Sequence, residues 1–473
     1  MQAALTSQTL RFLMALLGTV FGAASAFSGE EGRSKPTSEL KSKALPAPGG
    51  PPELTPVKKA EAVAAPPPMA ASQAAASGST LSELEASALA DPSAEAKPDA
   101  KAEEKKKEEP KWYEKIRIRG YSQIRYNRLG LSDYDLRSPN DRSIGPRNNL
   151  FIRRARMVFQ GDITDNLFIY IQPDFAIGIN NETNHILQMR DWYGDVALDE
   201  DKEHRIRVGQ SKIPYGWENL QSSQNRIALD RDDALNTGAV NERDVGVFYY
   251  WAPKEIRERF KHLVDSGLKG SGDYGVFGFG AYNGQSANRI ELNNTMHLVS
   301  RLTYPFELAN GQYFEPGVSG YYGRVQVNRD TGIEGPNDFR DSRFALSFTW
   351  YPQPWGLQGE FTWGRGPQFS DDQTFVSTER LHGGYIQTMY KIDTCRCGTL
   401  FPYARAQMYR GGRKSDTNAP AQDLREVEIG LEWQFTKALE LTSAWAWMDR
   451  NTTSSPYPNV DAGLLRFQFQ FNY

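Results

Sequence analysis

The sequence predicts an all-β protein, an antiparallel transmembrane β-barrel of about 16 strands that follows a disordered N-terminal segment rich in Ala, Pro, Lys and Glu. Three observations support this fold class. Apolar and polar residues alternate through most of 115–473, short and long connections alternate between these segments, and aromatic residues reach 12% without a long apolar run beyond the N-terminus. Composition alone fits a soluble β-sandwich or a lectin-like protein equally well, so the periodicity decides between them.

The first residues have the pattern of a signal peptide. Arg11 precedes the apolar stretch 12–21, and the small residues Ala24, Ser25 and Ala26 follow it. The stretch is too short for a transmembrane helix, but it fits the apolar region of a secretory signal. We therefore expect residues 1–26 to direct export and to be removed.

Residues 27–112 are expected to form a disordered periplasmic linker. The segment contains a Pro run at 66–68 and a charged run at 103–109, and no aromatic residue stands between Phe27 and Trp112. Such a composition cannot bury enough apolar surface to offset the entropy lost on ordering. A solvated spacer is one interpretation, and a segment that contacts the cell wall is the alternative.

From Trp112 onward, strands with one apolar and one polar face are predicted. At the start, the apolar face carries Ile116, Ile118, Ile124 and Tyr126, and the other carries Arg117, Arg119, Tyr121, Gln123 and Arg125. At the C-terminal end, Phe467, Phe469 and Phe471 alternate with Arg466, Gln468 and Gln470. An aromatic face of this kind promotes aggregation in water but is normal on the lipid side of a barrel.

The domain 113–473 is thus predicted to be a transmembrane β-barrel in the bacterial outer membrane, with short periplasmic turns and long outer loops. An amphipathic helix is expected within 252–272, where a short turn would otherwise be due. The predicted strands lie near 115–126, 150–161, 166–178, 188–198, 204–212, 243–251, 273–283, 297–306, 314–327, 342–350, 355–364, 382–392, 400–410, 424–435, 438–449 and 463–473.

The polar strand faces predict an electrically asymmetric lumen. Later strands mix Arg301, Arg343, Arg405 and Arg466 with Glu360, Glu426, Glu428 and Glu432, whereas the early strands supply mainly arginine. Arginine is permanently charged and donates several hydrogen bonds, so it can exchange an anion for water step by step. The alternative is that lumenal Arg and Glu pair with one another in a general pore. The candidate pore-lining and anion-binding residues are Arg117, Arg119, Arg125, Arg154, Arg156, Arg205, Arg207 and Lys212.

The connection 213–242 is the candidate constriction loop. If it folds into the pore, it brings charges of both signs to the narrowest point; alternatively, it packs outside as a subunit contact. Its charged residues are Arg226, Asp230, Arg231, Asp232 and Asp233.

Four segments, taken in order, resemble the phosphate-selective porin O and P family: 151–156 (FIRRAR), 209–220, 243–246 (RDVG) and 384–390 (GYIQTMY). The likeness extends over most of 115–473 and leaves the N-terminal linker uncovered. It implies a sixteen-stranded homotrimeric barrel that takes up small anions, with phosphate preferred by some members, through a pore lined by basic side chains. By position, only Lys212 and the strand arginines carry over from the family pattern.

Other function classes find little support. No nucleophile elbow, phosphate-binding Gly-rich loop or zinc-protease motif is present, so we expect neither an enzyme nor a cofactor or metal site. The formal net charge of −3 gives no reason to expect nucleic acid as a partner. The sequence therefore favours a passive diffusion porin with anion preference. The alternative is a structural barrel that tethers the envelope through its N-terminal linker.

Overall fold

The computed structural model describes residues 111–130, 150–176, 186–238, 243–394, 397–453 and 459–473. The expected signal peptide, and the expected linker except for its last two residues, lie outside the described residues. Within the described part of the chain, no helix is both long and apolar enough to cross a membrane.

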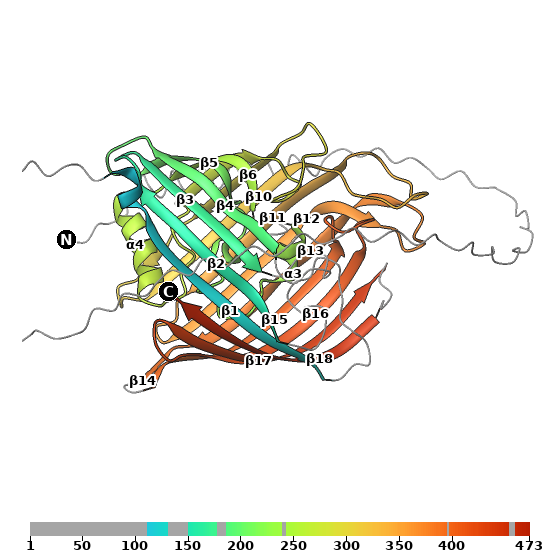
Figure 1. Ribbon diagram of the computed structural model, residues 1–473. Helices are drawn as coiled ribbons and strands as arrows, with labels where there is room; N and C mark the ends of the chain where they lie inside the picture. Colours follow the sequence, from blue (N-terminus) through green and yellow to red (C-terminus); the bar gives the residue numbers. More distant parts are fainter. Residues whose placement is uncertain (1–110, 131–149, 177–185, 239–242, 395–396, 454–458) are drawn as a thin grey trace, which may run out of the picture. The chain divides into compact units, whose positions relative to one another are not determined.

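The described strands form one antiparallel sheet that closes on itself (Figure 1). Closure occurs where β1 pairs with β18, from Tyr121 opposite Asn472 to Leu129 opposite Leu464. Sixteen long strands build the wall: β1 (Arg117–Leu129), β2 (Leu150–Asp162), β3 (Leu167–Ala176), β4 (Ile186–Ala197), β5 (His204–Lys212), β6 (Arg243–Trp251), β7 (Phe277–Tyr282), β8 (His297–Thr303), β10 (Tyr313–Val325), β11 (Phe339–Trp350), β12 (Trp355–Phe369), β13 (Val376–Tyr390), β15 (Gly398–Gly412), β16 (Ala421–Gln434), β17 (Leu439–Thr452) and β18 (Asn459–Asn472).

Two very short strands, β9 (Phe306–Glu307) and β14 (Ile392–Thr394), continue β8 and β13, because they pair with the same neighbours, β10 and β15. The predicted barrel of about sixteen strands is therefore confirmed. The main difference lies in the later strands, several of which run beyond their predicted ends into segments that were expected to be long loops. β12, for example, extends to Phe369.

Side-chain burial along β18 shows which face looks inward. Arg466, Gln468 and Gln470 are buried, whereas Phe467, Phe469 and Phe471 are exposed. This pattern is the reverse of that in a water-soluble sheet, in which the aromatic face would be covered. The apolar face of the barrel is its lipid-facing wall, and the polar side chains fill the interior.

Among the described residues, four short helices accompany the barrel: η1 (Trp112–Lys115), α2 (Trp217–Leu220), α3 (Asp233–Gly238) and α4 (Lys254–Asp265). The amphipathic helix expected within 252–272 is α4, and it buries Ile256, Phe260 and Leu263. Figure 1 shows α4 and the end of the chain at the same end of the barrel. We call this the short-turn end, and the opposite one the long-loop end.

Candidate functional site

The connection between β5 and β6 folds into the barrel and is anchored on the opposite wall. The backbone N–H groups of Trp217 and Glu218 donate to Glu360 Oε2 of β12, at 2.9 and 3.1 Å. Gly216 precedes them with a φ of 74°, and a Cβ there would lie 2.6 Å from Glu360 Oε1. Glycine is therefore required both by the backbone conformation and by the close approach of the wall.

A buried ion pair fixes the same end of the loop to β15. Arg405 Nη1 and Nη2 donate to the two carboxylate oxygens of Glu218, at 2.6 and 3.0 Å, and both side chains are almost fully buried. Further along, the loop returns to β1, where the Tyr121 hydroxyl lies 2.7 Å from Ser223 Oγ. The loop thus spans the lumen from β12 and β15 to β1.

Four arginines surround the single carboxylate of Asp230 near the middle of the loop. Their nitrogens lie 2.6 Å (Arg125), 3.2 Å (Arg466), 3.3 Å (Arg153) and 4.0 Å (Arg154) from its oxygens. Burial would raise the pKa of Asp230, but these cations hold it well below its ordinary value. Arg466 also pairs with Glu428, at 3.5 Å, so two carboxylates face four guanidinium groups and the cluster retains positive charge.

Two β-bulges add arginines to the interior that strict alternation would point outward. Gln123 pairs with Arg154 and Ile124 with Ile152, so Arg153 is the extra residue of β2. In β4, Arg190 is extra in the same way, where the register shifts beside Pro173. A bulge lets two consecutive residues face the same side of a sheet. Arg153 and Arg190 are therefore buried together with Arg154 and Asp191.

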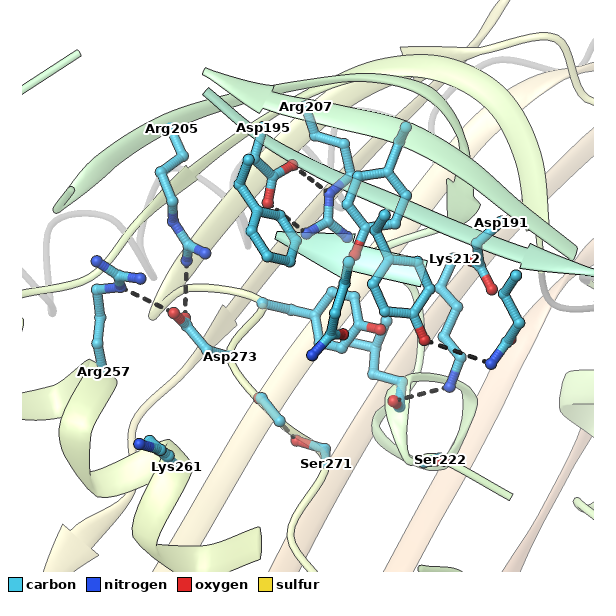
Figure 2. Close-up of a pocket in the computed structure, with 18 of the residues that line it drawn as sticks. Asp191, Asp195, Arg205, Arg207, Lys212, Ser222, Arg257, Lys261, Ser271 and Asp273 are labelled. Atoms are coloured by element: carbon cyan, nitrogen blue, oxygen red, sulfur yellow. Dashed lines mark hydrogen bonds and ion pairs between the residues drawn. The ribbon is translucent and has the colours of Figure 1, made fainter. Parts of the chain in front are cut away.

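A cavity of about 600 Å³ lies between the early strands, the inserted loop and α4 (Figure 2). Among the described residues, its lining contains nine basic side chains but only four carboxylates. The basic residues are Arg119, Arg156, Lys202, Arg205, Arg207, Lys212, Arg243, Arg257 and Lys261, and the acidic ones are Asp162, Asp191, Asp195 and Asp273.

Most of these carboxylates hold arginines in place. Asp195 accepts two hydrogen bonds from Arg207, at 2.7 and 2.8 Å. Asp273 lies between Arg205 and Arg257, at 2.8 and 2.9 Å, as Figure 2 shows. Burial would raise the pKa of Asp273, and these two arginines lower it instead. The side chains that line the cavity are therefore fixed as well as charged.

Arg119 and Lys261 differ from the other cations of the cavity. Both are exposed, and within the described part of the chain no carboxylate lies within ion-pair distance of either one. The hydrogen bond from Arg119 to Gln160 is long, at 3.4 Å. Figure 2 shows Lys261 on α4 at the edge of the cavity. These two charges are available to a solute.

A second insert, residues 266–276 between α4 and β7, enters the lumen from the short-turn end. After α4, the chain brings Lys269 to the far wall, where its Nζ lies 2.5 Å from Glu432 Oε1 of β16. The two inserts meet where Gln221 Nε2 donates to the carbonyl oxygen of Lys269, at 2.7 Å. Together they occupy the side of the lumen next to the later strands, so the large cavity lies along the early ones.

Comparison with known families identifies this barrel. The family model of the phosphate-selective porin O and P matches residues 125–473. The chain belongs to this family. It is therefore a porin of the bacterial outer membrane, and both its family and its fold are those of a channel.

Several solved outer-membrane proteins are similar over about three quarters of this porin. The channel DcaP of Acinetobacter baumannii has 13% identity and a TM-score of 0.48, covering 76% of this chain and 97% of that chain. The anion-selective porin from Comamonas acidovorans has 9% identity and a TM-score of 0.47, covering 76% and 99%. Salmonella typhi OmpF in complex with daunomycin has 15% identity and a TM-score of 0.48, covering 75% and 97%. Comparison with curated proteins finds no match.

The candidate pore residues of this porin occupy three places. Arg119, Arg156, Arg205, Arg207 and Lys212 line the large cavity. Arg125 and Arg154 belong to the cluster around Asp230. Arg117 is exposed near the start of β1 and does not line the cavity. Their roles in binding anions remain predictions.

The charged residues of the candidate constriction loop also make different contacts. Arg226 donates to the carbonyl oxygen of Ala228, and its buried Nη1 has no hydrogen-bond partner among the residues that the structure describes. Arg231 donates to Asn219 Oδ1, at 2.6 Å, within the loop itself. Asp233 pairs with Arg450 of β17, at 3.4 Å. Only some of these charges, therefore, reach the wall.

Asp232 caps α3. Its Oδ1 accepts hydrogen bonds from the N–H groups of Ala234 and Leu235, at 2.8 and 3.3 Å, as an N-cap residue does. Burial, together with the nearby carboxylate of Glu218, raises the pKa of Asp232 to about 7. The backbone N–H of Asp232 also donates to Glu218 Oε2, at 3.0 Å, so this carboxyl lies beside the ion pair that anchors the loop.

Sequence reasoning missed Arg153, Arg190, Lys261 and Lys269 as residues of the interior. Bulges hide the first two from any analysis based on alternation. Lys261 lies on α4, whose position against the cavity is a tertiary feature. The positive φ of Lys269, 66°, marks an irregular segment that has no periodic signal.

Proposed function

We propose that this porin is a passive diffusion channel for small solutes that prefers anions, phosphate among them. The observation that carries the proposal is the lining of the large cavity, in which basic side chains outnumber carboxylates by nine to four among the described residues. In a narrow, low-dielectric passage, such an excess raises the local concentration of anions and repels cations.

The ion pairs of the lining suit passage rather than permanent capture. Asp195 and Asp273 hold arginines in position and offset part of their charge. Conduction requires binding sites that attract the ion strongly enough for it to enter the pore but bind it weakly enough for it to leave again. An anion would move between the cavity and the arginine cluster at Asp230 by exchanging one set of guanidinium hydrogen bonds for the next.

A matched pair of lysines on α4 tests the proposal. Lys261 lines the cavity, whereas Lys254 lies on the same helix outside it, exposed and paired with Asp201 at 2.7 Å. We expect Lys261→Gln to lower the anion preference of the zero-current potential in a salt gradient. Lys254→Gln should leave the zero-current potential unchanged, because Lys254 lies outside the cavity and its exposed ion pair with Asp201 is screened by solvent.

Two outcomes would contradict the proposal: wild-type protein that prefers cations, or equal effects of the two substitutions. Phosphate itself is tested by replacing chloride with phosphate in the same measurement. The family resemblance also leads us to propose a homotrimer, which cross-linking of the detergent-solubilised protein would reveal as a three-chain product.

A further inference from the structure

Aromatic rings cover one side of the large cavity. Phe168 and Tyr170 of β3, Tyr193 of β4 and Tyr274 of the second insert all line it and are only partly buried. The rings of Tyr170 and Tyr193 are nearly parallel, at 10°, with their centroids 5.2 Å apart. We call Phe168, Tyr170, Tyr193 and Tyr274 the aromatic wall.

Arg207 packs against this wall. Its guanidinium carbon lies 3.8 Å from the ring centroid of Tyr193 and 5.5 Å from that of Tyr274. Because Asp195 accepts hydrogen bonds from two of its nitrogens, much of its charge is already balanced. The side chain is buried, and its guanidinium also lies 5.1 Å from the ring centroid of Tyr250, so it supports the tyrosine rings rather than facing a solute.

The unpaired cations flank the same space. Arg119 of β1 lines the cavity together with Tyr170, and Lys261 lines it from α4. The cavity thus combines flat aromatic surfaces with two charges available to an anion. A volume of about 600 Å³ is that of a site for a small organic molecule, and inorganic phosphate would fill only part of it.

We propose that this cavity is a binding subsite for planar organic anions, above all aromatic carboxylates. The ring lies against the aromatic wall, and the carboxylate pairs with Arg119 or Lys261. The inference rests on the anion preference proposed above and names the class of solute that the cavity favours.

The test compares two carboxylates with the same charge and similar size, benzoate and cyclohexanecarboxylate. Each is added to full-length protein in planar bilayers, and its apparent affinity is obtained from the block of the chloride current. We expect benzoate to bind threefold to tenfold more tightly, which corresponds to about 0.7–1.4 kcal/mol, the usual range of an aromatic pair.

Variants at Tyr170 separate the ring from its hydroxyl group. Tyr170→Leu should abolish the preference for benzoate, and Tyr170→Phe should keep it. Tyr390→Leu on the lipid-facing side of β13 serves as the control and should behave as wild type. Equal block by the two carboxylates, or an unchanged preference in Tyr170→Leu, would overturn the inference.

The zero-current potential, recorded on the same channels, distinguishes this failure from that of the proposed function. An anion-selective wild type that does not distinguish the two carboxylates retains the proposed function and loses the aromatic subsite. A cation-selective wild type loses the proposed function, whatever the block experiment shows.

Discussion

Replacing Arg405 by leucine perturbs the contact that holds the inserted loop across the lumen. The guanidinium makes two hydrogen bonds with Glu218 and lies 4.0 Å from the ring centroid of Tyr385. Without it, Glu218 stays buried but loses its ion-pair partner. Removing one partner of a buried ion pair costs about 3–5 kcal/mol. That cost lowers the ratio of docked to undocked loop by about a hundredfold to several thousandfold.

The assay is single-channel conductance together with hydrogen exchange of the loop. We expect Arg405→Leu to raise the conductance and to remove the protection of amides in 217–238. Arg410→Leu, five residues along the same strand but with its side chain 71% exposed, should match wild type. The double variant Glu218→Leu/Arg405→Leu should recover much of the docking, because apolar replacement of both partners removes the unpaired charge.

Heat-modifiable migration on gels shows whether each variant still forms a barrel. If Arg405→Leu folds, conducts like wild type and keeps its amide protection, this ion pair does not hold the loop.

Three further predictions concern pH, the second insert and the wall. Because the pKa of Asp232 is raised to about 7, the docked loop retains a proton that a solvent-exposed aspartate loses near pH 4. Docking should therefore weaken as the pH rises from about 4 to 7, which amide exchange measures, and Asp232→Asn should reduce this dependence while keeping the helix cap. Lys269→Met should leave Glu432 buried and unpaired and raise the conductance, whereas an unchanged conductance would mean that the second insert does not narrow the channel. Phe469→Arg should destabilise the barrel by up to about 2–4 kcal/mol in urea unfolding from lipid vesicles, and Phe469→Leu should have little effect.

The barrel could be predicted from the sequence because lipid and lumen impose a strict period of two. In β18, every second residue from Phe467 to Phe471 is aromatic, and the residues between them are polar. That signal is local, so it survives without any knowledge of the neighbouring strands. The ends of the later strands were less predictable, because β12 continues through Gly364, Gly366 and Pro367, which usually indicate a loop.

The interior was only partly predictable, since its shape depends on contacts between distant segments. The cations of the early strands followed from alternation, but the bulges at Arg153 and Arg190 depend on pairing with a neighbouring strand. The length of the β5–β6 connection indicated an insert, whereas its anchors, Glu360 and Arg405, lie more than a hundred residues away. The aromatic wall combines β3, β4 and the second insert, so no single segment predicts it.

The zero-current potential of the full-length protein across a KCl gradient tests most directly whether the cation-rich cavity makes this porin prefer anions. We predict a potential whose sign shows that chloride permeates more readily than potassium. This potential should move toward zero when Arg119 and Lys261 are both replaced by glutamine. A potential of the sign set by potassium, or none at all, would contradict the account.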